Sequence, residues 1–323
     1  MCFFGINTIK KLKDISISYR DRCRHPQKVA SQKKWDALGT LGILGFLGFN
    51  FISIIFYLIY NIMENELEEE EIKNYIEPEV YKFACDDEME GIPYPLPASI
   101  FRMACIGKSG SGKSNLIQAL TQSGGKKRIY NKRFSNVFIV SPSIASQAQK
   151  PKLPEDRFYT SLKDLPTIFD RLQNEEDMEG RTLIILDDLG SEIKPNGNGD
   201  DSVILKKLMN NGRHIGRPII DELTGRQIES GAVSVIISAQ KMTQLPRFIR
   251  SQLTHLAIFD CRNTKSEMIT LFEEFFACNK NVFNEILYRV FSKPYNFIFV
   301  DTKKSQIFNG FKSKFNIKNN NYL

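Results

Sequence analysis

An eight-residue stretch, Gly107–Ser114, reads GKSGSGKS and matches the pattern GxxxxGK[ST] in full. It follows an apolar run and opens a helical pattern, the context in which such a loop binds nucleotide phosphates. Glycines let backbone N–H groups wrap the β-phosphate, and the helix N-terminus adds a positive field. Lys113 is placed to bridge the β- and γ-phosphates, and the Ser114 hydroxyl to ligate Mg²⁺. The residues predicted to bind ATP are Gly107, Lys108, Ser109, Gly110, Ser111, Gly112, Lys113 and Ser114.

Two acidic residues, Asp187 and Asp188, directly follow the apolar run Leu183–Leu186. A strand that ends in acids delivers them where ligands bind in open α/β sheets. Asp187 is predicted to hold Mg²⁺ through water, and Asp188 to orient or deprotonate an attacking water. A strand that merely ends in a helix cap is the structural alternative, and the presence of the phosphate-binding loop disfavours it.

A polar amide, Gln240, follows a further apolar run, Val233–Ser238. At the carboxyl end of a strand it is placed to sense the γ-phosphate or to position water. Taken alone, the position is more typical of a surface glutamine, so this assignment depends on the neighbouring motifs.

Short apolar runs alternate with helical patterns from residue 98 onward, and these elements must position the polar residues. The predicted strands are Phe101–Ile106, Val137–Val140, Leu183–Leu186, Val233–Ser238, Leu256–Phe259 and Phe297–Val300. The predicted helices are Lys113–Gln122, Leu162–Asn174, Ser202–Asn211, Pro246–Leu253, Ser266–Cys278 and Val282–Phe291. The alternation predicts an α/β three-layer sandwich around a mostly parallel sheet. Because a strand pattern lies between the two motifs in the sequence, the order favours the P-loop class with an additional strand, whose members are mostly ATP-hydrolysing machines.

The order GKSGSGKS, LIILDD, NGRH, VSVIISAQ and LPRFIRSQLTHLAIF resembles the FtsK/HerA superfamily of DNA-pumping ATPases. Within it, the sequence is most similar to the genome-packaging ATPases of poxviruses and other large DNA viruses. The resemblance covers residues 98–302, and the Gln240 strand followed by LPRFIR is its discriminating part. It departs from the pattern at Asp188, where many relatives have Glu, and at Gly216–Gly231, which has the character of an insertion.

The resemblance implies an ATP-driven translocase that packages double-stranded DNA into a viral capsid. It implies that Gln240 senses the γ-phosphate and that Arg213, Arg247 or Arg250 reaches a neighbouring subunit's ATP, with Arg250 favoured. The implied partners are double-stranded DNA, further copies of the chain in a ring (a hexamer by resemblance), and capsid or portal-vertex proteins. The implied location is the virion or the viral assembly site in the host cytoplasm.

Two other interpretations stay open. One is a membrane-anchored DNA pump of the cell-division or conjugation type, which membrane fractionation would detect. The other is a P-loop kinase or nucleotide switch that does not act on DNA, which a phosphoryl-transfer assay would detect; the additional strand and Gln240 argue against it.

The N-terminal region divides by composition into a basic segment (1–35), a hydrophobic span (36–62) and an acidic linker (63–97). The uncharged part of the span covers about 39 Å as a helix, enough to cross a bilayer. The charges around it direct the ATPase domain (98–302) across the membrane, where ATP is scarce. The span is therefore either a transmembrane helix or part of a non-native extension, with Met63 as the natural start.

The net charge of +7 is unevenly distributed. Residues 1–62 hold nine Lys or Arg and three Asp, and the basic tail 303–323 holds five Lys and no acidic residue, which leaves −4 on residues 63–302. Bulk charge therefore does not supply DNA binding, which must come from local patches or loops. Lys194, in the Gly/Asn-rich loop Ser191–Ser202, is one candidate contact, although the loop is equally typical of a plain surface loop. The six scattered cysteines include no CxxC pair, which disfavours zinc and disulfide frameworks.

Overall fold

The computed structural model describes residues 88–121, 129–130, 132–144, 151–194, 197–261 and 265–317. All of them belong to one compact unit, Glu79–Leu323. The predicted hydrophobic span 36–62, the basic segment 1–35 and most of the acidic linker 63–97 lie outside the described residues. Within the described residues, no helix has both the length and the apolar character needed to cross a membrane.

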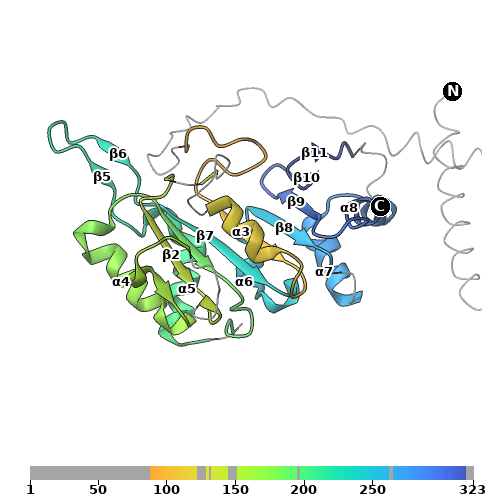
Figure 1. Ribbon diagram of the computed structural model, residues 1–323, viewed down its shortest axis with the longest axis horizontal. Coiled ribbons are helices and arrows are strands. Elements are labelled where there is room, and N and C mark those ends of the chain that lie inside the picture. The colour runs from red at the N-terminus through yellow and green to blue at the C-terminus, as the bar shows by residue number, and fades with distance from the viewer. Residues whose placement is uncertain are drawn as a thin grey trace, which may run out of the picture. The chain divides into compact units, whose positions relative to one another are not determined.

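A nine-stranded sheet forms the centre of the fold, with the strand order β11-β10-β9-β8-β1-β7-β4-β2-β3 (Figure 1). The strands from β8 to β3 in this order are parallel, and β9, β10 and β11 extend the sheet in antiparallel fashion. The strands of this sheet are β1 (Arg102–Ile106), β2 (Asn136–Val140), β3 (Phe158–Tyr159), β4 (Thr182–Leu186), β7 (Val233–Ala239), β8 (His255–Phe259), β9 (Phe297–Asp301), β10 (Gln306–Asn309) and β11 (Ser313–Lys314). All six predicted strands are present, because a sheet covered on both faces makes its strands nearly continuous apolar runs.

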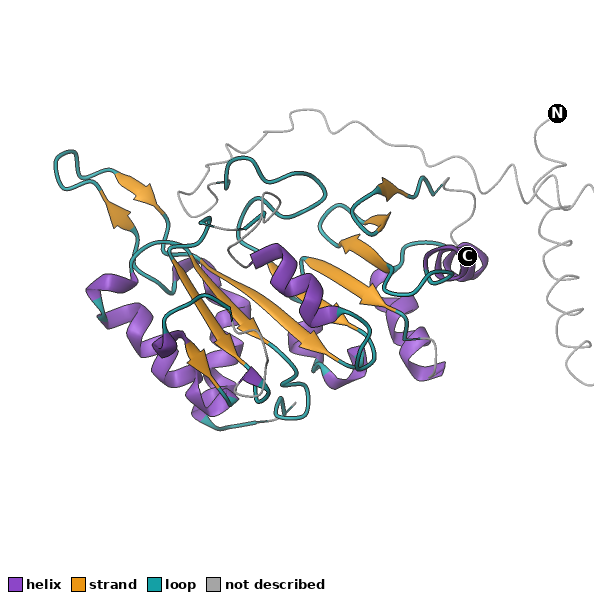
Figure 2. Ribbon diagram, in the orientation of Figure 1, coloured by secondary structure: helices purple, strands orange, loops and turns teal. Residues whose placement is uncertain are grey.

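Helices cover both faces of the sheet, as Figure 2 shows. The helices are α3 (Lys113–Thr121), α4 (Leu165–Asn174), α5 (Asp200–Asn211), α6 (Arg247–Arg250), α7 (Lys265–Phe275) and α8 (Lys280–Val290). Short 3-10 turns are η3 (Glu155–Arg157), η4 (Leu162–Asp164), η5 (Glu176–Met178), η6 (Gly212–His214) and η7 (Met242–Gln244). The predicted α/β three-layer arrangement is confirmed for this part of the chain.

Alternate residues of β1 point into two separate apolar cores. Ala104 and Ile106 belong to the core that is shared with α4, α5, α6, α7 and α8. Met103 and Cys105 belong to the opposite core, which includes Ile117 and Leu120 of α3. This alternation is what a strand with a side-chain period of two gives when both faces are buried.

The strand between β1 and β4 is β7, which ends just before Gln240. The additional strand that the sequence favours is thus present, but Val137–Val140 is not that strand, since β2 lies on the far side of β4. In register, Ile106 of β1 is opposite Ala239 and Leu186 of β4 is opposite Ile237. The carboxyl ends of these three parallel strands therefore meet at one edge of the sheet.

The predicted insertion Gly216–Gly231 folds as a separate hairpin, formed by β5 (Ile219–Ile220) and β6 (Gln227–Glu229). It projects from the body, at the upper left of Figure 1. Its base is a neck in which the Gly216 N–H donates to the Gly231 carbonyl at 2.9 Å. A Cβ on Gly231 would lie 2.1 Å from the Gly216 carbonyl oxygen, so this close approach requires glycine.

The packed region extends beyond residues 98–302. Met89 and Leu96, from the segment assigned to the acidic linker, are buried in the core on the α3 side. Strands β10 and β11 lie within the segment 303–323, and Phe308 of β10 is buried in the same core.

Candidate nucleotide-binding site

The loop between β1 and α3 adopts a backbone that its glycines permit. Gly110 and Gly112 have φ of +72° and +105°, a region that other residues rarely adopt. A Cβ on Gly107 would lie 2.6 Å from Cβ of Phe259, so the loop rests directly on β8. The Gly107 N–H donates to the Ala239 carbonyl at 3.2 Å, which ties the start of the loop to the end of β7.

Lys113 lies inside the loop, with its side chain almost fully covered. Its Nζ donates to the carbonyl oxygens of Gly107 at 2.7 Å and of Lys108 at 3.0 Å. Burial lowers the pKa of this ammonium, and the nearby carboxylates of Asp188 and Asp187 partly oppose that shift. The loop therefore holds a desolvated cation next to two acids, which a bound triphosphate would stabilise further.

Ser114 and Asp187 come together from two elements that are far apart in the sequence. The Ser114 hydroxyl donates to Asp187 Oδ2 at 3.1 Å. Both residues line a cavity of about 20 Å³, large enough for one water molecule. A hydroxyl and a carboxylate are hard oxygen donors of the kind that Mg²⁺ prefers beside phosphate oxygens, so this pair fits the predicted metal.

Ser238 joins the two acidic residues, and sequence reasoning did not single it out. Its fully buried hydroxyl donates to Asp187 Oδ1 and accepts the Asp188 N–H at 3.0 Å. Asp188 has φ of +58°, which is uncommon for a residue with a side chain. The contact with Ser238 fixes this unusual backbone and the Asp187 carboxylate at the same time. A serine near the end of an otherwise apolar strand was the available signal.

Gln240 lies beside Asp188, at the same edge of the sheet. Its Nε2 is 3.4 Å from Asp188 Oδ1. Its backbone N–H donates at 3.1 Å to Oε1 of Gln244, which also accepts the Lys241 N–H at 3.1 Å. The exposed amide of Gln240 is thus placed by a turn that the Gln244 side chain closes.

The buried carboxylate of Glu267 holds that turn from the other side. It accepts the Met242 N–H, the Thr243 N–H at 3.3 Å and the Thr243 hydroxyl at 3.1 Å. Glu267 lies in the first turn of α7, so α7 is attached to η7 through this side chain. No pattern in the sequence marked Glu267, since its partners lie in a turn that is distant in the sequence.

The arginines are placed differently from the favoured prediction. All three nitrogens of Arg250 are engaged within the chain, where Nε and Nη2 donate to the two Glu274 carboxylate oxygens at 2.7 Å and Nη1 donates to the Leu245 carbonyl at 2.8 Å. Its guanidinium joins α6 to α7, which does not fit a group that reaches out to a neighbour. Arg247, in the same helix, is exposed and has no acidic partner among the described residues.

Arg213 lies at the opposite edge of the sheet. It follows Gly212, whose Cβ position is 2.7 Å from the Val233 carbonyl at the start of β7. Burial is the main cause of the lowered pKa of Arg102 at the start of β1, and the charge of Arg213 lowers it further. Arg213 is therefore at the amino ends of these strands, while the phosphate-binding loop is at their carboxyl ends.

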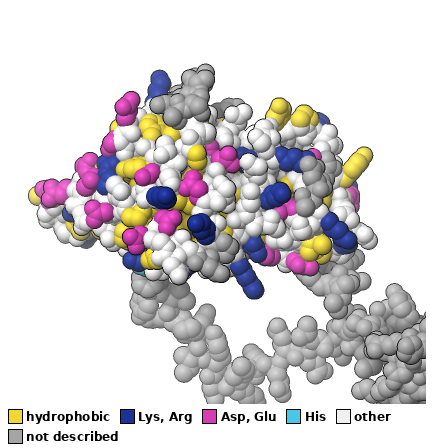
Figure 3. All heavy atoms as spheres, turned by 90° about the horizontal axis from the view of Figure 1, so that it is seen from below, with side chains coloured by type: hydrophobic (Ala, Val, Ile, Leu, Met, Phe, Trp, Pro, Cys, Tyr) yellow, Lys and Arg dark blue, Asp and Glu magenta, His cyan; other side chains and the backbone are white. Residues whose placement is uncertain are grey.

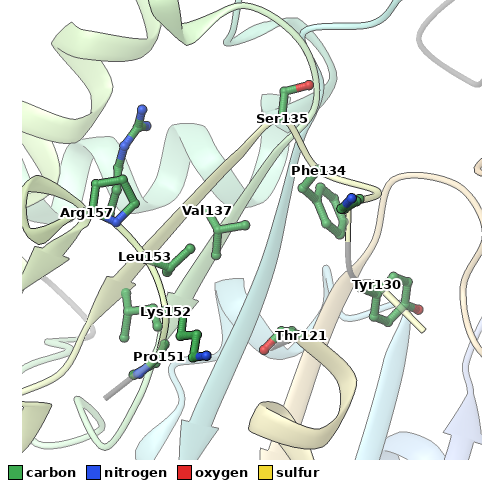
Figure 4. Close-up of a pocket in the computed structure, with 12 residues that line it drawn as sticks. Thr121, Tyr130, Phe134, Ser135, Val137, Pro151, Lys152, Leu153 and Arg157 are labelled. Atoms are coloured by element: carbon green, nitrogen blue, oxygen red, sulfur yellow. The ribbon is translucent and has the colours of Figure 1, made fainter. Parts of the chain in front are cut away.

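A separate pocket of about 260 Å³ lies beside Thr121 at the end of α3, Val137 of β2 and Leu153 (Figure 4). None of the predicted nucleotide-binding residues lines it. On the face that Figure 3 shows, the described Lys and Arg side chains are interspersed with Asp and Glu. Lys194 is exposed, between the buried Ile193 and residues outside the described part.

The parallel sheet, its strand order and the loop at its carboxyl edge resemble those of P-loop ATPases. The chain belongs to the Poxvirus A32 protein family, which matches residues 94–302. This match confirms the resemblance to poxvirus-type packaging ATPases. No curated protein matches the sequence.

Several solved structures are similar to this chain at low sequence identity. The genome packaging NTPase B204 from Sulfolobus turreted icosahedral virus 2, in complex with sulfate, is 14% identical, with a TM-score of 0.47 over 65% of this chain and 94% of that one. The same protein with ATP-gammaS is 15% identical, with a TM-score of 0.45 over 65% and 95% of the two chains. The pCW3 conjugation coupling protein TcpA is 11% identical, with a TM-score of 0.39 over 65% and 60%.

Proposed function

We propose that this chain is an ATP hydrolase that drives double-stranded DNA into a viral capsid. Its membership of the Poxvirus A32 protein family supports the packaging role. The observation that carries the hydrolytic role is the placement of Asp187, Asp188 and Gln240 against the phosphate-binding loop, with Ser238 linking the two acids. A loop that only bound nucleotide would not need a second, separately oriented acid.

The residues divide the work between binding and hydrolysis. Backbone N–H groups of Gly107–Ser114 bind the phosphates, and Lys113 leaves its carbonyl partners to contact the β- and γ-phosphates. Ser114 and, through water, Asp187 would hold Mg²⁺, which would neutralise charge on the phosphate oxygens.

Asp188 accepts a hydrogen bond from the attacking water and takes its proton as the water oxygen bonds to the γ-phosphorus. The bond from that phosphorus to the bridging oxygen breaks, and ADP and phosphate are released. The Gln240 amide, 3.4 Å from Asp188 Oδ1, contacts the γ-phosphate. When the phosphate leaves, this contact is lost and the position of the adjoining turn η7 changes.

The proposed working form is a ring of identical subunits, a hexamer by resemblance, at the virion or the viral assembly site. DNA passes through the ring, and capsid or portal-vertex proteins hold it in place. We assign the residue that reaches a neighbour's ATP to Arg247 rather than Arg250, because Arg250 is bound to Glu274. A membrane-anchored pump remains the alternative that residues 36–62 favour, and membrane fractionation separates the two.

The test is DNA-stimulated ATP hydrolysis by the full chain and by Lys113→Ala. We expect Lys113→Ala to lose at least about a hundredfold in rate, since it removes the buried ammonium that the loop encloses. Lys280→Ala, an exposed lysine at the start of α8, is the matched control and keeps the wild-type rate. Hydrolysis that survives Lys113→Ala would show that the site is wrongly assigned.

A further inference from the structure

The positions of the acidic residues define how a nucleotide is oriented in the site. Asp187, Asp188 and Gln240 follow β4 and β7, on one side of the phosphate-binding loop. The γ-phosphate must face these groups. The nucleoside end of the ligand therefore extends toward the other side of the loop, where β8 and β9 lie.

Tyr295 occupies that other side. It lies in the turn between α8 and β9, and because Phe297 of β9 pairs with Phe259 of β8, this turn is at the same edge of the sheet as the loop. Its Cδ1 is 3.5 Å from the Cβ position of Gly112, next to Lys113. Tyr295 is nevertheless 71% exposed, so its open surface adjoins the loop.

The backbone of Tyr295 is held in an uncommon conformation. Its φ is +62°, which costs energy for a bulky residue and persists only where neighbouring contacts impose it. Two contacts flank it, since Asn296 Nδ2 donates to the Val290 carbonyl at 3.2 Å and the Phe297 carbonyl accepts the Gly310 N–H at 2.8 Å. The turn is thereby fixed to the end of α8 and to β10.

A row of packed aromatic side chains lies next to the turn. Phe259, which is buried under the loop, has its ring centroid 5.3 Å from that of Phe297, and Phe297 is 5.0 Å from Phe311. Such packed ring pairs leave little freedom to the residues they contain. The Cβ position of Gly112 is 3.5 Å from Phe259 Cε1 and 3.5 Å from Tyr295 Cδ1, so Tyr295 meets the loop beside this aromatic layer.

We propose that the Tyr295 ring stacks on the base of the bound nucleoside triphosphate. This rests on the proposed function, because it places a base only if the loop binds a nucleotide. Stacking uses the face of the base and not its hydrogen-bonding edge, so it supports adenine and guanine alike. Tyr295 is then a binding residue that adds affinity without choosing between purines.

The experiment compares two ligands on the full chain by calorimetry. One is a non-hydrolysable ATP analogue, and the other is inorganic tripolyphosphate, which has no base. Tyr295→Ala is expected to weaken the analogue roughly tenfold, the effect of one lost base–aromatic stack, and to leave tripolyphosphate unchanged. Tyr295→Phe is expected to bind the analogue with wild-type affinity. Tyr295→Ala is expected to weaken binding of the corresponding GTP analogue by the same factor as that of the ATP analogue.

The matched control is Tyr288→Ala, which removes a tyrosine that is 75% exposed in α8 and leaves both affinities unchanged. Unchanged analogue binding by Tyr295→Ala overturns the stacking contact, as does an equal loss for tripolyphosphate. If Lys113→Ala abolishes binding of the analogue and Tyr295→Ala retains it, the stacking contact is overturned and the proposed function stands. If the wild-type chain does not bind the analogue, the proposed function fails, and the stacking contact fails with it.

Discussion

At the scale of single residues, the Ser238 hydroxyl performs two functions with one oxygen. It donates its proton to Asp187 and accepts the backbone N–H of Asp188, so the position of each acid depends on the other. A hydroxyl suits this arrangement because it is both a donor and an acceptor. The nucleotide site thus contains a buried polar link that neither the phosphate-binding loop nor the two acids supply by themselves.

Ser238→Ala is expected to lower kcat about tenfold, because it frees the Asp188 backbone and leaves a hydrogen bond to a carboxylate unmade. ATP affinity, measured without hydrolysis, should change far less. Ser234→Ala is the matched control, since Ser234 is buried in the same strand, where its hydroxyl accepts the Phe101 N–H at 3.3 Å. An equal fall in kcat for both variants would contradict the role given to Ser238.

His255 makes the stability of the fold depend on pH. Burial lowers the pKa of this imidazole to about 4, against the opposing pull of Asp301 and with a smaller contribution from Lys303 and Lys304. In the unfolded chain the ring takes up a proton below its ordinary pKa of about 6.5, while the folded chain resists protonation until about pH 4. The unfolded state therefore binds more protons in this window, and stability is lost as the pH falls through it.

The free energy of unfolding should fall by about 2 kcal/mol between about pH 7.5 and about pH 5, from this residue alone. Urea denaturation at the two pH values measures the change. His255→Gln removes this component, whereas His214→Gln, at an exposed position, retains it. A pH dependence that is the same in His255→Gln and in the wild type would refute the assignment.

The site residues that could be predicted from the sequence are those that belong to local motifs. Lys113, Ser114, Asp187, Asp188 and Gln240 each follow an apolar run, and the register of the strands brings them together. The supporting side chains bond to groups that only the fold brings near them, so Ser238, Gln244 and Glu267 carried no comparable pattern. The pair between Arg250 and Glu274 could not be predicted, because a sequence does not show that α6 lies against α7.

At the scale of elements, α6 depends on its neighbours for its position. It has only four residues, too few for a helix to be stable alone. Ile249 is buried in the core on this face, and Lys206 of α5 lies over the Phe248 ring at 5.7 Å from its centroid. The bidentate pair between Arg250 and Glu274 completes the attachment by joining α6 to α7.

Arg250→Ala is expected to destabilise the fold by about 1–2 kcal/mol, since the pair is bidentate and half-buried. A double-mutant cycle with Glu274→Ala should assign most of this loss to the interaction between the two side chains. ATP hydrolysis at a temperature where both proteins are folded should change little. Abolished hydrolysis at unchanged stability would instead restore Arg250 as the residue that acts on a neighbouring subunit.

Long apolar runs made most elements predictable, and short or exposed elements escaped. Most side chains of the six predicted strands are buried, which gives a strong pattern. Strand β3 has two residues, and the β5–β6 hairpin exposes its side chains, with Leu223 at 95%. Strand β10 lies in a Lys- and Asn-rich segment whose composition masks Ile307 and Phe308. The predicted helix Pro246–Leu253 proved shorter because the chain turns after Arg250 to enter β8.

At the scale of the whole molecule, Arg247 and the phosphate-binding loop offer a test of assembly. Arg247→Ala should retain nucleotide binding and lose hydrolysis, because in a ring each site would lack its neighbour's guanidinium. Lys113→Ala should lose hydrolysis because its own phosphate-binding loop is defective, while its Arg247 remains intact. A mixture of the two inactive variants forms some interfaces that combine an intact loop with an intact Arg247, so activity should reappear.

The mixing experiment is read as the rate of ATP hydrolysis against the proportion of the two variants, at fixed total protein and DNA. A maximum near equal proportions is expected. Zero activity at every proportion would exclude the interface role of Arg247, provided that size-exclusion chromatography shows the two variants in one assembly. The control is a mixture of two differently tagged preparations of Arg247→Ala, which should stay inactive.

The glycine neck of the β5–β6 hairpin has a practical and an evolutionary consequence. Gly216 and Gly231 meet through one backbone hydrogen bond, so the chain leaves and re-enters the body at nearly the same point. The tip of the hairpin, around the exposed Leu223, can be replaced, lengthened or exchanged for a tag while Arg217 and Glu229 keep the base bound to the body. The hairpin tip is therefore the natural place to attach a fluorophore for observing assembly, and a place where the chain tolerates a change in length.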